Sequence, residues 1–162
     1  MSVAVPSDFD AENADNFEEI EKQFAVKAVM QAQTYWNLLG KVKGSELRLT
    51  KLDNEIYQHL ITDFPEYSTA ESVAKINEAE MKNHKGKERW RKFMNTYEKT
   101  VHDFNFGTLL RTDAEAEYEE QTTIFVPRMQ FLAIEIARNK YGLNDWIYED
   151  EKKLEAAAAV KK

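Results

Sequence analysis

The chain has 162 residues, of which 43% are hydrophobic, and this is enough for one domain with a substantial core. It contains no cysteine, so disulfide frameworks, thiolate metal sites and thiol catalysis are excluded. The net charge of −7 argues against a general nucleic-acid binder, and we expect no direct, sequence-specific nucleic-acid partner. No leader and no long apolar run is visible, so we expect a soluble cytoplasmic protein without membrane contact, with the nucleus as a second compartment.

The N-terminal segment 1–14 is polar and acidic, and we expect a flexible tail there. From Asp15 to Gly40, apolar residues recur at steps of three and four residues, which predicts an amphipathic helix. One face of this helix carries Phe17, Ile20, Phe24, Ala28, Tyr35 and Leu38. A second set widens that face, so we expect the helix to be buried on more than one side: Val26, Val29, Met30 and Trp36.

A second helix is predicted over residues 50–64, where Thr50 and Asp53 form a loose capping box. Two short helices follow, at 68–76 and 77–84.

A stronger helix is predicted after Gly86. Its apolar stripe is interpreted as core packing and consists of Trp90, Phe93, Met94, Tyr97, Val101 and Phe104.

The last strong helical pattern runs from Ile124 to Tyr141 and contains Pro127. Either Pro127 lies in the first turn or the helix starts earlier and is kinked there, and we favour the kinked helix. Gly142 fits the left-handed position after a helix end. Residues 149–162 are helix-prone but lack a full apolar face, so we expect a frayed or extended tail.

These patterns predict an all-α fold. We expect a compact single-domain bundle of about five to six helices over residues 15–148. An acidic N-terminal tail precedes it, and a helix-prone, charged and Ala-rich C-terminal tail follows it.

No motif for catalysis or for binding a metal or cofactor stands out. The five glycines form no phosphate-binding loop, and the three histidines lack metal-ligand spacing. Asp8 and Asp10 match the D-x-D pattern of some sugar-nucleotide transferases, but they lie in the predicted tail. A further acidic run is typical of solvated side chains near a helix start: Glu115, Glu117, Glu119 and Glu120. We therefore expect no enzyme, no metal and no cofactor.

One segment reverses the sign of the overall charge. Residues 82–92 have a net charge of +5, which leaves −12 for the rest of the chain. The basic side chains are Lys82, Lys85, Lys87, Arg89, Arg91 and Lys92. The segment is either a solvated helix face or a docking surface for an acidic partner.

The segment 105–113 is a second candidate, because it is not periodic and places a glycine beside an aromatic residue. It is either a structured connector, in which Arg111 and Asp113 pair, or a binding loop. In the second case the contacting residues are Asn105, Phe106, Gly107, Thr108, Arg111 and Asp113.

Five separated segments together resemble the eukaryotic polysaccharide-biosynthesis-domain-containing protein family, and the chain looks like a fungal member. They are EIEKQFAV (19–26), LRLTKLDNEIY (47–57), ERWRKF (88–93), NFGTLLRTDA (105–114) and EIARNKYGLNDW (135–146). Their order and approximate spacing match over residues 12–147, whereas Pro127 departs from the family pattern.

The resemblance implies a small all-helical domain and a function that the family name does not describe. It implies a dedicated chaperone that binds newly synthesised translation elongation factor 1-alpha at the ribosome, with help from the nascent polypeptide-associated complex. The chaperone would hold the GTP-binding domain near its switch region until nucleotide is bound. Residues 82–92 and 105–113 are our candidates for these contacts.

Two other functions stay open on the sequence. One is a generic protein-interaction adaptor with another partner. The other is a factor of polysaccharide biosynthesis, which is suggested only by the family name and by Asp8 and Asp10.

Overall fold

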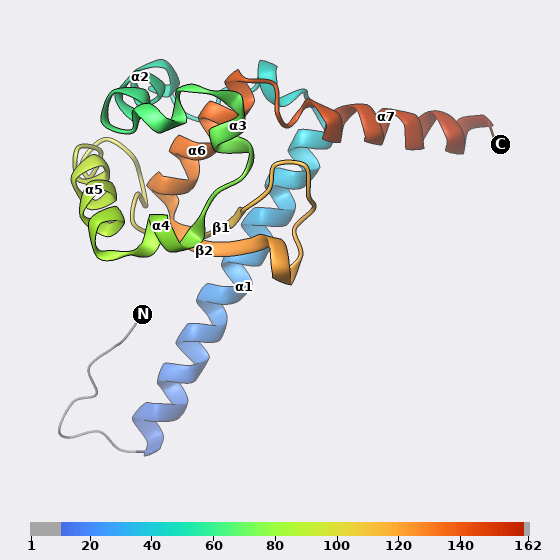
Figure 1. Ribbon diagram of the computed structural model, residues 1–162. Coiled ribbons are helices and arrows are strands. Elements are labelled where there is room, and N and C mark those ends of the chain that lie inside the picture. The colour runs from blue at the N-terminus through green and yellow to red at the C-terminus, as the bar shows by residue number, and fades with distance from the viewer. Residues whose placement is uncertain (1–10, 161–162) are drawn as a thin grey trace.

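The computed structural model describes residues 11–160, with side-chain burial from residue 22 onward. Figure 1 shows a compact body from which the first part of α1 and the last part of α7 project. The elements in chain order are α1 (Ala11–Lys41), α2 (Asp53–Asp63), α3 (Ala70–Ala74), α4 (Glu78–Lys82), α5 (His84–Asn95), β1 (Gly107–Arg111), β2 (Thr123–Pro127), α6 (Arg128–Lys140) and α7 (Asp145–Val160). Short 3-10 helices lie at Gly44–Glu46, Pro65–Ser68 and Glu120–Thr122.

Helix α6 lies at the centre of the body and contacts α2, α3, α5 and both strands. Every residue from Met129 to Asn139 is buried. The helix ends as its sequence predicts, because Gly142 adopts the left-handed conformation with φ 74°. The amide of Gly142 donates to Asn139 O at 3.1 Å and the amide of Leu143 donates to Arg138 O at 2.9 Å, which caps the last carbonyls.

The prediction of an all-α fold is correct for most of the chain but misses a small sheet. Strands β1 and β2 pair antiparallel, with Gly107 opposite Pro127 and Arg111 opposite Thr123. The predicted helix from Ile124 to Tyr141 is therefore two elements, a strand and a helix. Pro127 is the last residue of β2 and immediately precedes α6, so the predicted kinked helix is wrong. Proline fits there because the extended backbone needs no helical amide donor.

The wide buried face predicted for the first helix is also wrong. The buried apolar side chains on α1 form one narrow stripe, which consists of Ala28, Ala32, Tyr35 and Leu39. Five large apolar side chains are 40–61% exposed: Phe24, Val26, Val29, Met30 and Leu38. The side chains of Phe17 and Ile20 lie outside the part of the chain for which burial is described.

Both ends of the chain differ from the tails that the sequence suggests. Helix α1 already includes residues 11–14, whereas residues 1–10, with Asp8 and Asp10, lie outside the described residues. At the other end, α7 is helical to Val160 and makes seven α-helices within the described chain, against five to six predicted. The start of α7 docks on the body, because Ile147 is buried and Trp146 packs against the core. Residues 149–160 are exposed.

The middle of the chain forms helices where the sequence predicts them, with shifted ends. The carboxylate of Asp53 accepts from the Thr50 amide at 2.7 Å, but Thr50 is not the N-cap, because α2 begins at Asp53 with Leu52 before it and has no side-chain cap. The stripe that begins at Trp90 is core packing, although α5 ends at Asn95 and the last stripe residues lie in turns. Trp90 stacks on Phe64 with ring centroids 4.4 Å apart, which joins α5 to the end of α2.

Candidate interaction surfaces

The basic segment 82–92 lies on α4 and α5, where its cations divide into two groups. Lys82 pairs with Glu78 at 2.9 Å. The guanidinium of Arg89 lies over the Phe64 ring and donates to both carboxylate oxygens of Glu66, at 2.7 and 2.9 Å. Hydrogen bonding from Arg89 lowers the pKa of Glu66. These two cations therefore stabilise the fold locally, because Arg89 ties α5 to the segment that follows α2.

The other four cations of this segment are exposed: Lys85, Lys87, Arg91 and Lys92. They lie on the exposed side of α5 together with one carboxylate, that of Glu88, so this side has a net positive charge, as the docking interpretation requires. The same exposure fits a solvated helix face equally well, so the role of this surface stays a prediction.

The segment 105–113 is mostly a strand and its side chains fall into different environments. Asn105 is exposed, and Gly107 and Asp113 are half-buried. The half-buried ring of Phe106 packs against Phe24 of α1, with centroids 5.6 Å apart. Thr108 and Arg111 are 4% and 1% exposed, so little of either side chain is accessible at the surface.

Arg111 pairs with Glu135 of α6 rather than with Asp113. Its Nη2 lies 3.4 Å from Glu135 Oε1 and donates to Asn144 Oδ1 at 2.6 Å. Arg138 approaches the same carboxylate with Nη1 3.1 Å from Oε2. Arg138 also donates to the backbone carbonyls of Val73 and Arg111, at 2.7 and 2.8 Å.

This buried network holds one carboxylate between two guanidinium groups. Burial by itself would raise the pKa of Glu135, but the charges of Arg138 and Arg111 outweigh it and hold the pKa below its ordinary value. Burial also lowers the pKa of Arg138 and raises that of the neighbouring Tyr35 phenol. Since these groups are enclosed, the network joins β1, α3 and α6 and fixes where β1 lies.

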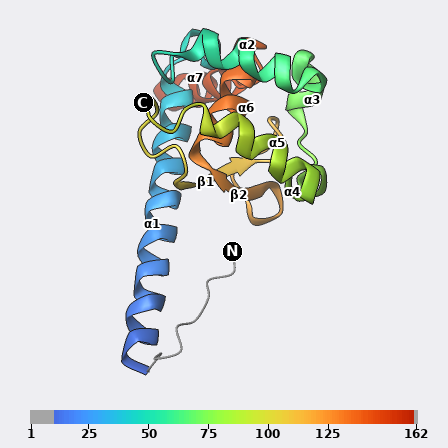
Figure 2. The same ribbon diagram turned by 90° about the vertical axis from the view of Figure 1, so that its left-hand side faces the viewer.

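The structure does not bring the two predicted segments together. Figures 1 and 2 show α5 and α1 on opposite sides of α6, with β1 running beside α1. The first half of the segment 105–113 lies against α1 and not against α5.

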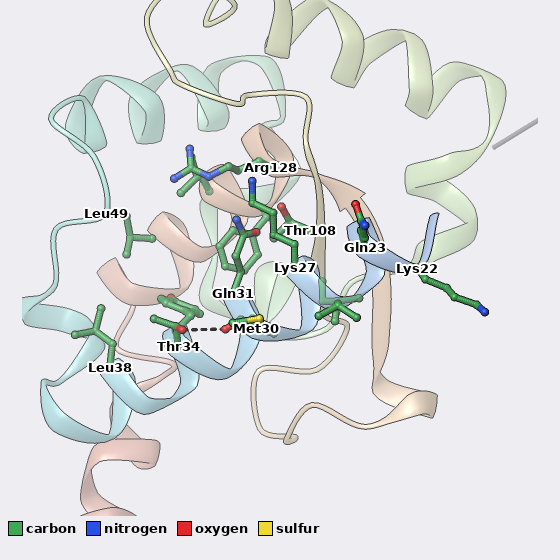
Figure 3. Close-up of a pocket in the computed structure, with 16 residues that line it drawn as sticks. Lys22, Gln23, Lys27, Met30, Gln31, Thr34, Leu38, Leu49, Thr108 and Arg128 are labelled. Carbon is green, nitrogen blue, oxygen red and sulfur yellow. Dashed lines mark hydrogen bonds between the residues drawn. The ribbon is translucent and has the colours of Figure 1, made fainter. Parts of the chain in front are cut away.

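A groove of about 940 Å³ runs along α1 and was missed by the sequence analysis. Figure 3 shows Lys22 and Gln23 at one end, Leu38 and Leu49 at the other, and Lys27 and Arg128 between them. One wall is formed by α1, and the other includes Thr108 and Leu109 of β1 and Phe131 and Leu132 of α6.

The sequence contains a signal for this surface. The apolar residues of α1 cover a face wider than one neighbouring element can bury, and five of them remain exposed in the structure. Val26, Met30 and Leu38 line this groove, whereas Val29 lines a separate pocket on the other side of α1. Exposed apolar side chains that gather in a groove are typical of interaction sites in soluble proteins.

The histidine and acidic side chains that could bind a metal ion are either far apart or already hydrogen-bonded to other residues. His59 bonds to Tyr97 and Asp63, at 2.8 Å each, whereas the side chains of His84 and His102 are each 92% exposed. The acidic residues from Glu115 to Glu120 are exposed. Among the side chains described from residue 22 to residue 160, no three carboxylate or imidazole groups converge in a way that could hold a metal ion.

Sequence comparison then decides the family. A profile of the PBDC1 protein family matches residues 20–149. The chain belongs to the PBDC1 family. PBDC1 is the polysaccharide-biosynthesis-domain-containing family, so the resemblance seen in five segments of the sequence is confirmed.

Relatives in fungi and mammals support the same assignment. The PBDC1 homolog of Saccharomyces cerevisiae is 63% identical over 141 residues, which are 87% of this chain and 97% of that protein. The PBDC1 homolog of Schizosaccharomyces pombe is 64% identical over 87% of this chain and 96% of its own length. Human PBDC1 is 39% identical over 91% of this chain and 62% of its own length.

A solved structure shows the same fold. The solution NMR structure of a protein from Saccharomyces cerevisiae matches with a TM-score of 0.77 and 62% identity, over 89% of this chain and 99% of that one. Within the described part of the chain, no helix is long and apolar enough to cross a membrane.

Proposed function

We propose that this protein is a dedicated chaperone for newly synthesised translation elongation factor 1-alpha. It binds the GTP-binding domain near the switch region at the ribosome, where the nascent polypeptide-associated complex assists it. It protects that domain until nucleotide is bound. Membership of the PBDC1 family supports the proposal, because the chaperone function is what resemblance to that family implies.

The single structural observation that supports a holding function is the exposed apolar face of α1. Val26, Val29 and Met30 are 55–61% exposed, although the same helix buries other apolar side chains such as Tyr35 and Leu39. A folding GTP-binding domain exposes apolar surface before nucleotide orders it. Burial of such surface against α1 is favourable by roughly 25 cal/mol per Å², so the face supplies affinity without any catalytic group.

Release of the client follows from the coupling between chaperone binding and GTP binding. The chaperone binds a client state whose surface is exposed, and GTP binds the state in which that surface is ordered. Nucleotide binding therefore lowers the population that the chaperone recognises, and the complex dissociates without hydrolysis by the chaperone.

The test is translation of elongation factor 1-alpha in an extract depleted of this protein. We expect the new factor to aggregate or be degraded, and added purified protein to restore the soluble, GTP-binding fraction. An unrelated GTPase translated in the same extract is the matched control and should be unaffected. Equal yields of folded elongation factor with and without the protein would exclude the proposal.

A further inference from the structure

We propose that the groove along α1 holds an acidic amphipathic helix of the client. The inference rests on the proposed function, and it names the binding surface and the chemistry of the segment that occupies it. The basic face of α5 is then not the site that holds the client.

The charged residues around the groove indicate the sign of the partner's charge. The charged residues among those lining it are Lys22, Lys27 and Arg128, and all three are cationic. The charge of the rim is therefore opposite in sign to the net charge of the chain, which has 29 acidic and 22 basic residues. A segment with carboxylates beside its apolar residues therefore pairs with the rim, whereas a basic segment is repelled.

The apolar side chains of the groove require apolar residues on the partner as well. Val26, Met30 and Leu38 line the groove from α1, and Leu49, Phe131 and Leu132 line it from the other elements. The three α1 side chains are 58%, 61% and 40% exposed, so a partner removes substantial apolar area from water when it packs there.

The shape of the groove favours a helix. The lining residues of α1 run from Lys22 to Leu38 at steps of three and four, which form the ridges that a second helix packs against. Their span corresponds to about 24 Å, or between four and five helical turns. An occupant of this length presents apolar residues at i, i+3, i+4 and i+7 and keeps its acids toward Lys27 and Arg128.

Part of the candidate segment 105–113 lies beside the groove. Thr108 and Leu109 form part of the groove wall, and Lys27 lies 4.6 Å from the centre of the Phe106 ring. The first half of the segment 105–113 thus borders the groove. The face of α5 differs, because its exposed cations lie beside the exposed carboxylate of Glu88 and adjoin no exposed large apolar side chain.

The experiment compares two charge reversals of equal size in the full chain. One variant carries Lys22→Glu and Lys27→Glu at the groove, and the other carries Lys85→Glu and Lys87→Glu on α5. All four side chains are exposed, so both variants should fold, which circular dichroism and thermal unfolding check. Binding to the nucleotide-free GTP-binding domain of elongation factor 1-alpha is measured by pull-down titration.

We expect the groove variant to lose about tenfold in affinity and the α5 variant to stay within about twofold of wild type. A second groove variant, Val26→Gln with Met30→Gln, should lose at least as much, because it removes apolar burial and leaves the charge unchanged. Groove variants that bind like the wild type, or an equal loss in the α5 variant, would overturn the inference. If the wild-type protein itself fails to bind, the proposed function fails instead.

Hydrogen exchange of the client in the wild-type complex then identifies the segment held. We expect the protected segment to be net negative, with apolar residues at helical spacing. A protected segment that is net positive, or that forms a strand, contradicts the proposal.

Discussion

Helices α6 and α1 are both rich in apolar residues, yet they have opposite surroundings. Helix α6 is buried from Met129 to Asn139, and even its charged residues Glu135 and Arg138 are 1% and 0% exposed. Helix α1 buries a single stripe and leaves large apolar side chains such as Met30 in solvent. Figure 1 shows the reason, since α6 has neighbours on several sides whereas part of α1 projects from the body.

The difference separates residues that maintain the fold from residues that are available to a partner. In α6 the cost of burying charge is offset by pairing, so these side chains contribute to one defined arrangement of β1, α3 and α6. In α1 the exposed apolar side chains contribute little to folding. Substitutions in the two helices should therefore affect different measurements.

The largest effect on stability is expected from Glu135→Gln. The substitution keeps the shape of the side chain but leaves the guanidinium groups of Arg111 and Arg138 buried without their counter-charge. We expect a loss of about 3–5 kcal/mol in the free energy of unfolding, measured by urea titration. A loss below about 1 kcal/mol would mean that water or rearrangement compensates both cations.

A smaller or similar loss is expected from Ile134→Ala, which creates a cavity in the core. Ile134 is 0% exposed, and truncation of a buried isoleucine costs about 2–5 kcal/mol. Thermal and urea unfolding should agree on this loss, while client binding by the remaining folded protein should be unchanged. Weakened binding per folded molecule would show that the core and the groove are coupled.

Acid should destabilise the wild type partly through Glu135. Its pKa is lower in the folded protein than its ordinary value, so the unfolded chain takes up the proton more readily. The stabilisation is complete above the ordinary glutamate value of about 4.3 and is lost as the pH falls through the folded pKa. We expect the stability difference between the wild type and Glu135→Gln to stay constant down to about pH 4.3 and to narrow at lower pH, and a difference that stays constant in acid would refute this assignment.

The smallest effect on stability is expected from Met30→Gln on α1. Met30 is 61% exposed, so the free energy of unfolding should change by no more than about 0.5 kcal/mol. The same variant should bind the client more weakly. Destabilisation comparable to that of Ile134→Ala would show that this side chain belongs to the core.

Local sequence patterns predict the helices well where the structure depends on neighbouring residues alone. The end of α6 at Gly142 and the hydrogen bond from the Thr50 amide to the Asp53 carboxylate follow from residue types and spacing alone, although α2 begins at Asp53 and not directly after Thr50. The sheet was missed because Phe125 continues the helical spacing of Met129 and Leu132, so residues 124–127 fit the start of that helix. The structure resolves this, since Ile124 and Val126 are buried while Phe125 between them is 48% exposed, which is the alternation of a strand.

The candidate site was only partly predictable, for a related reason. The positive charge of 82–92 can be read from the sequence, but the pairing of Arg89 with Glu66 depends on tertiary packing. Arg111 also looks like a surface donor in a loop, whereas its partner Glu135 is 24 residues away and buried. The width of the apolar face on α1 was visible, but whether a neighbouring element covers it depends on the whole fold.

The most direct test of the account is photo-crosslinking from α1. A photoreactive benzoylphenylalanine replaces Met30, and a control protein carries it in place of Leu154, an apolar residue on α7 that is 66% exposed. We predict that the probe at Met30 crosslinks to the GTP-binding domain of newly translated elongation factor 1-alpha and that added GTP abolishes the crosslink, whereas the probe at Leu154 does not crosslink. A client crosslink from Leu154 with none from Met30 would contradict the account.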